Sequence, residues 1–290
     1  GRRATVAFST HWQDDAARRD FTINALYAHP QTLAISDWFD GLADLDLRRV
    51  RFIGDARERI REDHLRILRY YRFQARFGAM LDGEAEAACA DMAPMLKGLS
   101  RERVAMELLT LLALPSPFDT VARMFERGVL PVVLPEVDAA GIAALGALLA
   151  AEADCDIAPA AIRRLAALLP ADPRLADQVA ARLRLSTAQR KHLVRLARRL
   201  AGGEQARALA YAEGRAVATD LLLLARRNPV DIGPDPLPMF PLKGGQVVAR
   251  GVGAGPEVAR VLQAVEARWI AEQFPGEERV AQLLDEALRG

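Results

Sequence analysis

The stretch RFIGDARERIREDHLRILRYYRF (51–73) carries the most regular pattern in the chain. Its apolar positions, followed on to residue 75, recur at helical spacing: Ile60, His64, Ile67, Leu68, Tyr71 and Ala75. The charged positions lie on the opposite side, where Asp63, Arg66, Arg69 and Arg72 step by three. The pattern therefore predicts one amphipathic helix over 57–77 with an arginine-rich outer face.

That outer face has two interpretations. One is a solvated surface, on which the i,i+4 ion pair Glu62–Arg66 stabilises the helix by a few tenths of a kcal/mol. The other is a binding site. A carboxylate accepts a hydrogen bond from the exocyclic amine of a base, whereas a guanidinium donates to ring acceptors or phosphates. A rigid helix that presents both groups can contact the edge of a nucleotide directly. The residues alone leave both interpretations open.

The segment before this stretch contains the β signals of the chain. Short runs with Val, Ile, Phe or Trp, bounded by turn-forming residues, predict strands over 4–8, 33–39 and 48–53. A helix is expected from about Asp15 to Tyr27, with Asp14 or Asp15 as its N-cap. The segment DGLADL (40–45) is typical of a loop between strands. Together these elements predict a small β-α-β-β piece.

The segment after it is predicted to be helical almost throughout. Pro and Gly separate the candidate helices, and Ser100 is expected to be the N-cap of one of them. Residues 228–241 are rich in proline and are expected to form a linker. The predicted helices cover 83–93, 100–113, 117–127, 138–152, 159–167, 174–183, 186–201, 204–212, 214–225, 244–250, 255–273 and 277–288.

Composition sets the class of protein. The 290 residues are 51% hydrophobic and 27% charged, which is typical of a globular chain and excludes a disordered or collagen-like one. The net charge of +1 indicates no general attraction to nucleic acid, although only three of the 39 basic residues are lysines. Cys89 and Cys155 lie far apart and form no metal motif or disulfide framework, which favours a reducing compartment. With no signal peptide or membrane-spanning run, we expect a cytoplasmic protein without a membrane partner.

Two further segments contain candidate functional residues. In RRDFTINAL (18–26), Arg19, Asp20 and Asn24 can share an exposed face, either as a surface ion pair with a helix-end Asn or as contacts to phosphate and ribose. In LSRERVAMEL (99–108), the pattern is that of a well-capped helix, and we assign it that role.

These four segments, in this order, resemble the motifs of bacterial class II tRNA nucleotidyltransferases, the CCA-adding enzymes, and of their poly(A) polymerase relatives. The resemblance covers about residues 4–135, and the pattern EDxLRxLRxxRF beside RRDFTINA is its most specific part. It implies a mainly α fold with a small α/β part, in which a truncated nucleotidyltransferase head is followed by a helical neck, body and tail. The expected segments are 1–54 for the head, 55–135 for the neck with base recognition, 136–227 for the body and 228–290 for a tRNA-binding tail.

The resemblance also implies a function, the template-independent addition of C, C and A to the 3′ end of tRNA from CTP and ATP. Glu62, Asp63 and Arg66 would contact the base edge, and Arg69 and Arg72 would support them or touch phosphate. Arg19 would contact the nucleotide, and Asp20 or Asn24 the ribose. The 40–45 segment, with Asp40, Gly41 and Asp44, would be a flexible loop.

The sequence departs from the family in the catalytic half of the site. The Gly-Gly segment and the Asp-x-Asp pair that binds metal should precede the first strand, and neither is present. Since residue 1 is Gly and a strand is predicted almost at once, we expect a C-terminal part of a longer polypeptide. The catalytic residues and the ligands of Mg²⁺ are then expected outside this chain. The isolated chain should not incorporate CTP or ATP into tRNA lacking its CCA end.

Two other functions remain as alternatives. One is a poly(A) polymerase of the same family. The other is a non-catalytic RNA-binding protein, whose arginines at 182, 184, 190, 195, 198 and 199 would follow an RNA backbone. The sequence makes no prediction of the oligomeric state.

Overall fold

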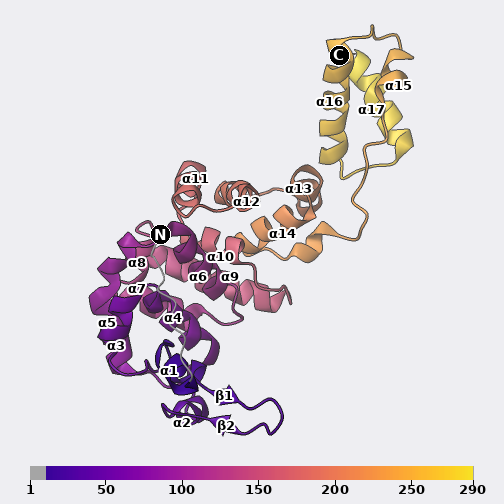
Figure 1. Cartoon of the computed structure of the whole chain (residues 1–290). Coiled ribbons are helices and arrows are strands. Elements are labelled where there is room, and N and C mark those ends of the chain that lie inside the picture. Colours follow the sequence, from indigo (N-terminus) through magenta and orange to yellow (C-terminus); the bar gives the residue numbers. More distant parts are fainter. Residues whose placement is uncertain (1–10, 290) are drawn as a thin grey trace. The chain divides into compact units, whose positions relative to one another are not determined.

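The computed structural model describes residues 11–289, which are mainly helical with one sheet of two strands (Figure 1). The chain divides into two compact units, which meet in sequence at Arg199 and Leu200. None of the helices over 11–289 has the combination of length and apolar character that spanning a membrane requires.

The first unit begins with short elements: α1 (Trp12–Ala17), η1 (Thr22–Asn24), β1 (Tyr27–Ala28), β2 (Ile35–Ser36) and α2 (Gly41–Asp46). The two strands are antiparallel, with Tyr27 opposite Ser36. Several predictions here are wrong. The helix expected over 15–27 ends at Ala17, the strand over 33–39 is reduced to β2, and the loop over 40–45 is helix α2. The strand over 48–53 is replaced by isolated bridges, and the strand predicted over 4–8 lies outside the described residues.

Pairing between distant segments explains why the first helix stops. The backbone N–H of Thr22 donates to the carbonyl of Arg51 (3.1 Å), and that of Ile53 donates to the carbonyl of Asp20 (3.1 Å). Phe21 is fully buried against Phe52, with ring centroids 4.9 Å apart. Because this extended pairing buries an aromatic side chain, it outweighs the local helical propensity of residues 18–26.

The arginine-rich stretch forms two helices instead of the single predicted one. They are α3 (Ala56–Glu62), capped by Asp55, and α4 (Arg66–Phe77). Asp63 has the extended backbone angles φ −151° and ψ 105°, and its Oδ1 accepts from the N–H of Leu65 at 3.1 Å. This local side-chain bond competes with helical bonding and stabilises the break at residues 63–65.

The rest of the first unit is helical, as predicted. Ser100, Asp138, Asp172 and Ser186 each cap the helix that follows them, so the side chain of Ser100 has its expected role. The helices are α5 (Gly83–Met92), η2 (Ala93–Gly98), α6 (Arg101–Leu112), α7 (Phe118–Glu126), α8 (Leu130–Val133), α9 (Ala139–Asp154), α10 (Ala161–Leu168), α11 (Pro173–Arg182) and α12 (Thr187–Ala197). Helix α4 packs on α6 and α7, and its buried residues Tyr70 and Tyr71 contribute to the core.

A cluster of buried charges joins three of these helices. Glu152 on α9 accepts hydrogen bonds from Arg163 and Arg164 on α10 (both 2.8 Å), and all three side chains are at most 3% exposed. Arg164 also donates to the carbonyl of Leu112 at the end of α6 (2.7 Å). The cluster therefore fixes the C-terminal end of α6, the helix that lines the candidate site.

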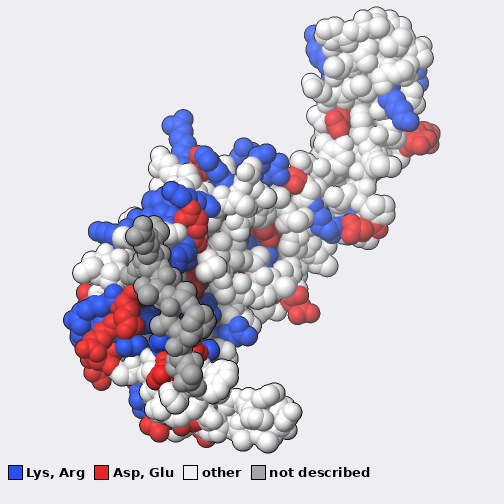
Figure 2. Space-filling model, in the orientation of Figure 1, with Lys and Arg blue, Asp and Glu red and all other residues white. Residues whose placement is uncertain are grey.

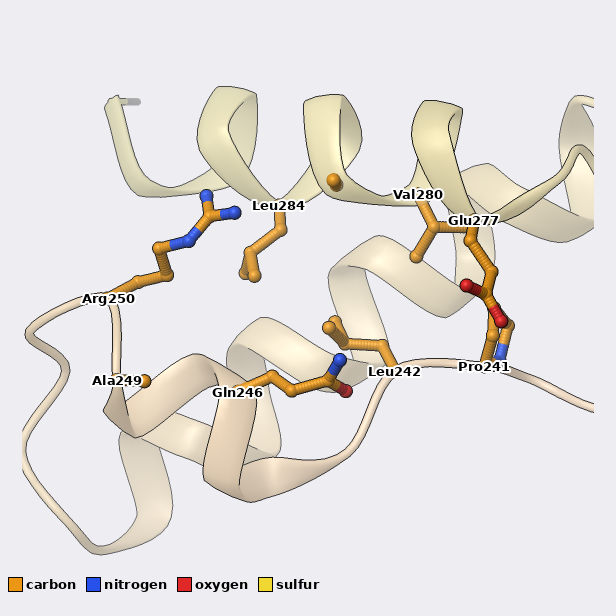
Figure 3. Close-up of a pocket in the computed structure, with 9 residues that line it drawn as sticks. Pro241, Leu242, Gln246, Ala249, Arg250, Glu277, Val280 and Leu284 are labelled. Atoms are coloured by element: carbon orange, nitrogen blue, oxygen red, sulfur yellow. The ribbon is translucent and has the colours of Figure 1, made fainter.

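The second unit contains α13 (Ala206–Glu213), α14 (Arg215–Leu224), η3 (Pro229–Ile232), α15 (Gly244–Val248), α16 (Pro256–Ala271) and α17 (Glu277–Arg289). One apolar cluster lies between α13 and α14, and another surrounds Trp269. The segment 228–241 is more than the predicted linker, because Ile232 in η3 is fully buried in the first of these clusters. A pocket of about 290 Å³ lies between α15 and α17, with Leu242 and Val280 among its lining residues (Figure 3).

Candidate nucleotide-binding site

A pocket of about 440 Å³ in the first unit brings together most of the predicted site. Its lining residues are Arg19, Asp20, Asn24, Asp63, Leu65, Arg66, Arg69, Arg103, Met106 and Glu107. Six of the eight side chains predicted to bind nucleotide are among them. The other two, Glu62 and Arg72, do not line the pocket but pair with residues that do.

Asp20 lies at the centre of the polar network and is 6% exposed. One carboxylate oxygen accepts from the N–H of Phe21 and from the amide Nδ2 of Asn24, both at 3.0 Å. The other accepts from Nε of Arg69 at 2.5 Å. The buried charge is thus neutralised by an arginine of α4, and the same carboxylate holds the amide of Asn24.

Glu107 on α6 is the second buried carboxylate, at 4% exposed. It accepts a hydrogen bond from Nε of Arg72 at 2.5 Å and lies 3.8 Å from Nη1 of Arg69. Both guanidinium groups lie over the ring of Phe73, at 4.7 Å for Arg72 and 5.5 Å for Arg69. Burial works against the charge of Arg69, but the bond to Asp20 and the attraction of Glu107 outweigh it, so the pKa of Arg69 is raised.

Arg66 ties the start of α4 to two other segments. Its guanidinium donates to the backbone carbonyls of Arg59 (2.8 Å) and Arg18 (3.0 Å) and pairs with Glu62. The i,i+4 pair expected from the sequence is therefore formed. These bonds also fix the orientation of the guanidinium at the edge of the pocket.

Asp63 and Arg103 form an ion pair across the pocket. Nη2 of Arg103, on the first turn of α6, lies 2.6 Å from Oδ2 of Asp63. Because Asp63 stands in the break between α3 and α4, its carboxylate is presented by a loop and not by the helix face that the periodicity predicted.

Arg19 lies at the mouth of the pocket and is about half exposed. Its Nε donates to the hydroxyl of Tyr27 (3.2 Å), and its Nη2 donates to Asp15 (3.2 Å). Hydrogen bonds from Tyr27 and Arg19 hold the pKa of Asp15 below its ordinary value.

The segment predicted as a flexible loop is helical and does not line this pocket. Asp40 has a left-handed backbone (φ 61°), Gly41 begins α2, and Asp44 is completely buried. Asp44 accepts from Thr22 (2.6 Å), Arg49 (2.7 Å) and Arg51 (2.8 Å). Burial opposes its charge, but these donors outweigh it and lower the pKa of Asp44. Movement of the segment during nucleotide selection stays a prediction.

Metal binding finds no support among residues 11–289, where no group of three or more His, Cys, Asp or Glu side chains is placed to hold an ion. The described residues therefore do not fit the Mg²⁺ that the family resemblance implies.

Sequence reasoning missed part of the pocket. Arg103 and Glu107 belong to the segment LSRERVAMEL, which was given only a structural role. The signal that could have found them is their i,i+4 spacing, which places both on one face of α6. The pocket thus presents carboxylates and guanidiniums from three segments, a set suited to a planar ligand with its own donors and acceptors.

Comparison with known proteins agrees with this arrangement. The family model "Poly A polymerase head domain" matches residues 1–51, and "Probable RNA and SrmB-binding site of polymerase A" matches residues 78–140. The mitochondrial CCA tRNA nucleotidyltransferase 1 of Mus musculus is 42% identical over 134 residues, 45% of this chain and 31% of that protein. Poly(A) polymerase I of Haemophilus influenzae is 37% identical over 127 residues, 44% of this chain and 28% of that protein.

Solved structures share the fold over nearly the whole chain. The Thermotoga maritima CCA-adding enzyme complexed with tRNA matches with a TM-score of 0.71 and 20% identity, covering 96% of this chain and 73% of that one. The Bacillus stearothermophilus CCA-adding enzyme in complex with CTP matches with a TM-score of 0.69 and 24% identity, covering 96% and 75%. The fold is therefore that of the CCA-adding enzymes.

By sequence, parts of the chain are thus similar to tRNA nucleotidyltransferases and poly(A) polymerases. The matched region spans less than a third of the length of these curated relatives.

Proposed function

We propose that this chain is the base-recognition part of a tRNA nucleotidyltransferase that adds CCA to the 3′ end of tRNA, with CTP and ATP as substrates. The observation that carries the proposal is the pocket of about 440 Å³, which gathers six of the predicted nucleotide-binding side chains from separate segments. The relatives that act on tRNA or bind CTP, by their names, support the same substrates.

The chemistry of the base edge supports selection of C and A. Both bases carry an exocyclic amine, whereas U and G carry a carbonyl oxygen at the corresponding position. In the proposal the carboxylate of Asp63 accepts from that amine, and Arg66 or Arg103 donates to the neighbouring ring nitrogen. Glu62 acts by holding Arg66, with which it pairs.

The remaining polar groups serve the sugar and the phosphates. Asp20 and Asn24, which already bond to each other at 3.0 Å, are proposed to contact the ribose. Arg19, at the mouth of the pocket, is proposed to contact phosphate. Arg69 keeps Asp20 in place through their 2.5 Å bond, and Arg72 does the same for Glu107.

Calorimetric titration of the 290-residue chain with CTP, ATP, GTP and UTP tests the proposal. We expect CTP and ATP to bind more tightly than the other two. Asp63→Asn turns an acceptor into a donor and should lower the affinity for CTP and ATP roughly 5- to 150-fold, the worth of a base-edge contact. Asp91→Asn is the matched control, because Asp91 is an exposed carboxylate paired with Arg57 outside the pocket. Equal binding of all four nucleotides, or no binding, would contradict the proposal.

The same titration addresses the alternatives. A pure poly(A) polymerase would bind ATP and not CTP. A non-catalytic RNA-binding protein would bind RNA with a steep salt dependence and neither nucleotide. Figure 2 shows basic side chains gathered over α11 and α12, which favours RNA binding in either case. The basic residues of the segment 173–198, which includes α11 and α12, are Arg174, Arg182, Arg184, Arg190, Lys191, Arg195 and Arg198.

Two further parts of the proposal concern the whole protein. Transfer of a nucleotidyl group would require Mg²⁺, and its ligands would come from outside the described residues. A cytoplasmic location is proposed from the unpaired Cys89 and Cys155, although the mouse relative is named as mitochondrial. Cell fractionation tests the location.

A further inference from the structure

Three aromatic side chains form a continuous surface beside the candidate pocket. The Trp12 ring on α1 lies against that of Tyr27 on β1, with centroids 5.4 Å apart and planes at 56°. Tyr27 in turn meets the ring of Trp38 edge-on, at 5.7 Å. Trp12 is 68% exposed, which is unusual for a side chain with so much apolar surface.

Arg19 connects this surface to the pocket. Its guanidinium carbon lies 5.2 Å from the centre of the Tyr27 ring, and its Nε donates to the Tyr27 hydroxyl at 3.2 Å. Arg19 also lines the pocket proposed to hold the incoming nucleotide. The tyrosine hydroxyl donates to Asp15 as well, so the ring is held from two sides.

We propose that Trp12, with Tyr27 and Trp38 behind it, is a stacking surface for an unpaired base at the 3′ end of the RNA that is being extended. The inference rests on the proposed function, because it places the RNA end beside the nucleotide pocket. Every base has a π face, so stacking on an exposed indole accepts different bases in turn. That property suits a terminus whose last base changes with each addition.

The surrounding charges favour a contact through the base and not through the backbone. Asp14 and Asp15 lie on α1 next to Trp12, and Asp15 is paired with Arg19, so the charges around the indole have no positive excess that would attract phosphate. An interaction that depends on stacking leaves the salt dependence of binding nearly unchanged when the aromatic ring is removed. This feature separates the surface from a general basic RNA-binding patch.

The test compares an RNA hairpin that has a short unpaired 3′ extension with the same hairpin made blunt. Affinity is measured by fluorescence anisotropy of the labelled RNA with the full chain. Trp12→Leu keeps an apolar side chain but has no π face, whereas Trp12→Phe keeps the face. Ile35→Ala is the matched control, since Ile35 is also an exposed apolar side chain (55%) on the adjoining hairpin.

We expect Trp12→Leu to weaken binding of the extended hairpin roughly 5- to 150-fold, the effect of losing one stacked base, with an unchanged salt slope. Trp12→Phe and Ile35→Ala should stay close to the unchanged protein, and the blunt hairpin should be insensitive to all three. The extended hairpin should also quench tryptophan emission, and Trp12→Leu should abolish most of that quenching. Trp269, the third tryptophan, is 2% exposed and should contribute little to it.

An unchanged affinity for the extended hairpin in Trp12→Leu overturns the inference, as does an equal loss with the blunt hairpin. Quenching by CTP or ATP alone, lost in Trp12→Leu, would assign the surface to the free nucleotide and would also overturn it. Calorimetry with CTP keeps the two proposals apart. If CTP binds normally and Trp12→Leu leaves the affinity for the extended hairpin unchanged, the stacking surface is refuted and the nucleotide pocket is not. A selective RNA effect without CTP binding refutes the nucleotide pocket, and leaves an RNA-stacking surface without its proposed neighbour.

Discussion

Asp44 is completely buried and accepts hydrogen bonds from Thr22, Arg49 and Arg51. Burial disfavours its charge, but the three donors outweigh that effect, so its folded pKa lies below the ordinary value. The unfolded chain therefore takes up this proton at a higher pH than the folded chain. The contribution of Asp44 to the free energy of unfolding is complete above the unfolded pKa of about 3.9, and it is lost as the pH falls through the folded value.

Asp44→Asn should accordingly lower stability at neutral pH and make the acid dependence shallower. Urea unfolding between about pH 7 and pH 2 measures both effects. Asp46→Asn is the control, because it makes the same chemical change at an exposed position of the same helix. If the free energy of unfolding changes with pH in the same way in Asp44→Asn as in the unchanged protein, Asp44 does not cause the acid dependence.

At the scale of single residues, the sequence predicted much of the pocket. The family resemblance predicts Asp20, Asp63 and Arg69 as nucleotide-binding residues, and all three line one cavity. Arg103 and Glu107 were missed because their importance arises from the packing of α6 against α4, which no local pattern encodes. The binding roles themselves stay predictions.

At the scale of elements, the sequence predicts helix starts correctly where the capping residue bonds to its own first turn. Ser100 and Ser186 begin helices within one residue of the predicted positions, because their side chains bond to the first turn. The break between α3 and α4 was missed, because Ile60 and Ile67 are seven residues apart and keep the helical period across it. The early end of α1 was missed since the pairing of Phe21 with Phe52 spans distant segments.

Glu107 links α6 to α4, and its replacement tests how the pocket is held together. Glu107→Gln removes the negative partner of Arg72 and Arg69 at a site 4% exposed, so we expect a loss of about 1–3 kcal/mol in the free energy of unfolding. The affinity for CTP should fall as well, since Arg69 loses the attraction of the Glu107 carboxylate. Denaturant unfolding and calorimetry measure the two effects.

Glu86→Gln is the matched control for that experiment. Glu86 is equally buried and holds Arg123 and Arg127, but it does not line the pocket. It should destabilise the chain by a similar amount without changing CTP affinity. If both variants lose affinity in proportion to their lost stability, Glu107 acts only in folding and has no positioning role.

At the scale of the whole molecule, the structure divides into two compact units after Arg199. The predicted boundaries at 54, 135 and 227 follow the family resemblance and stay predictions. The division was hard to see in the sequence, because Gly202 and Gly203 resemble an ordinary turn between two helices. Their positive φ angles of 104° and 82° mark the point where the helical path is interrupted.

Limited digestion with a protease of broad specificity should cut first at residues 201–203. These residues are exposed and lie outside the helices, and the two units have separate apolar clusters. Mass spectrometry should find two resistant fragments that meet near this position. Initial cleavage inside α9 or α16 would contradict the division into two units.

The buried cluster of Glu152, Arg163 and Arg164 has a consequence for the evolution of the sequence. Replacing Glu152 leaves two guanidinium groups without their carboxylate at a site at most 3% exposed, which costs several kcal/mol. Replacing all three residues by apolar residues that fill the same volume is often neutral or favourable. A path that loses Glu152 while both arginines remain therefore passes through a less stable protein. We expect few lineages of this chain to combine both arginines with a neutral residue at position 152.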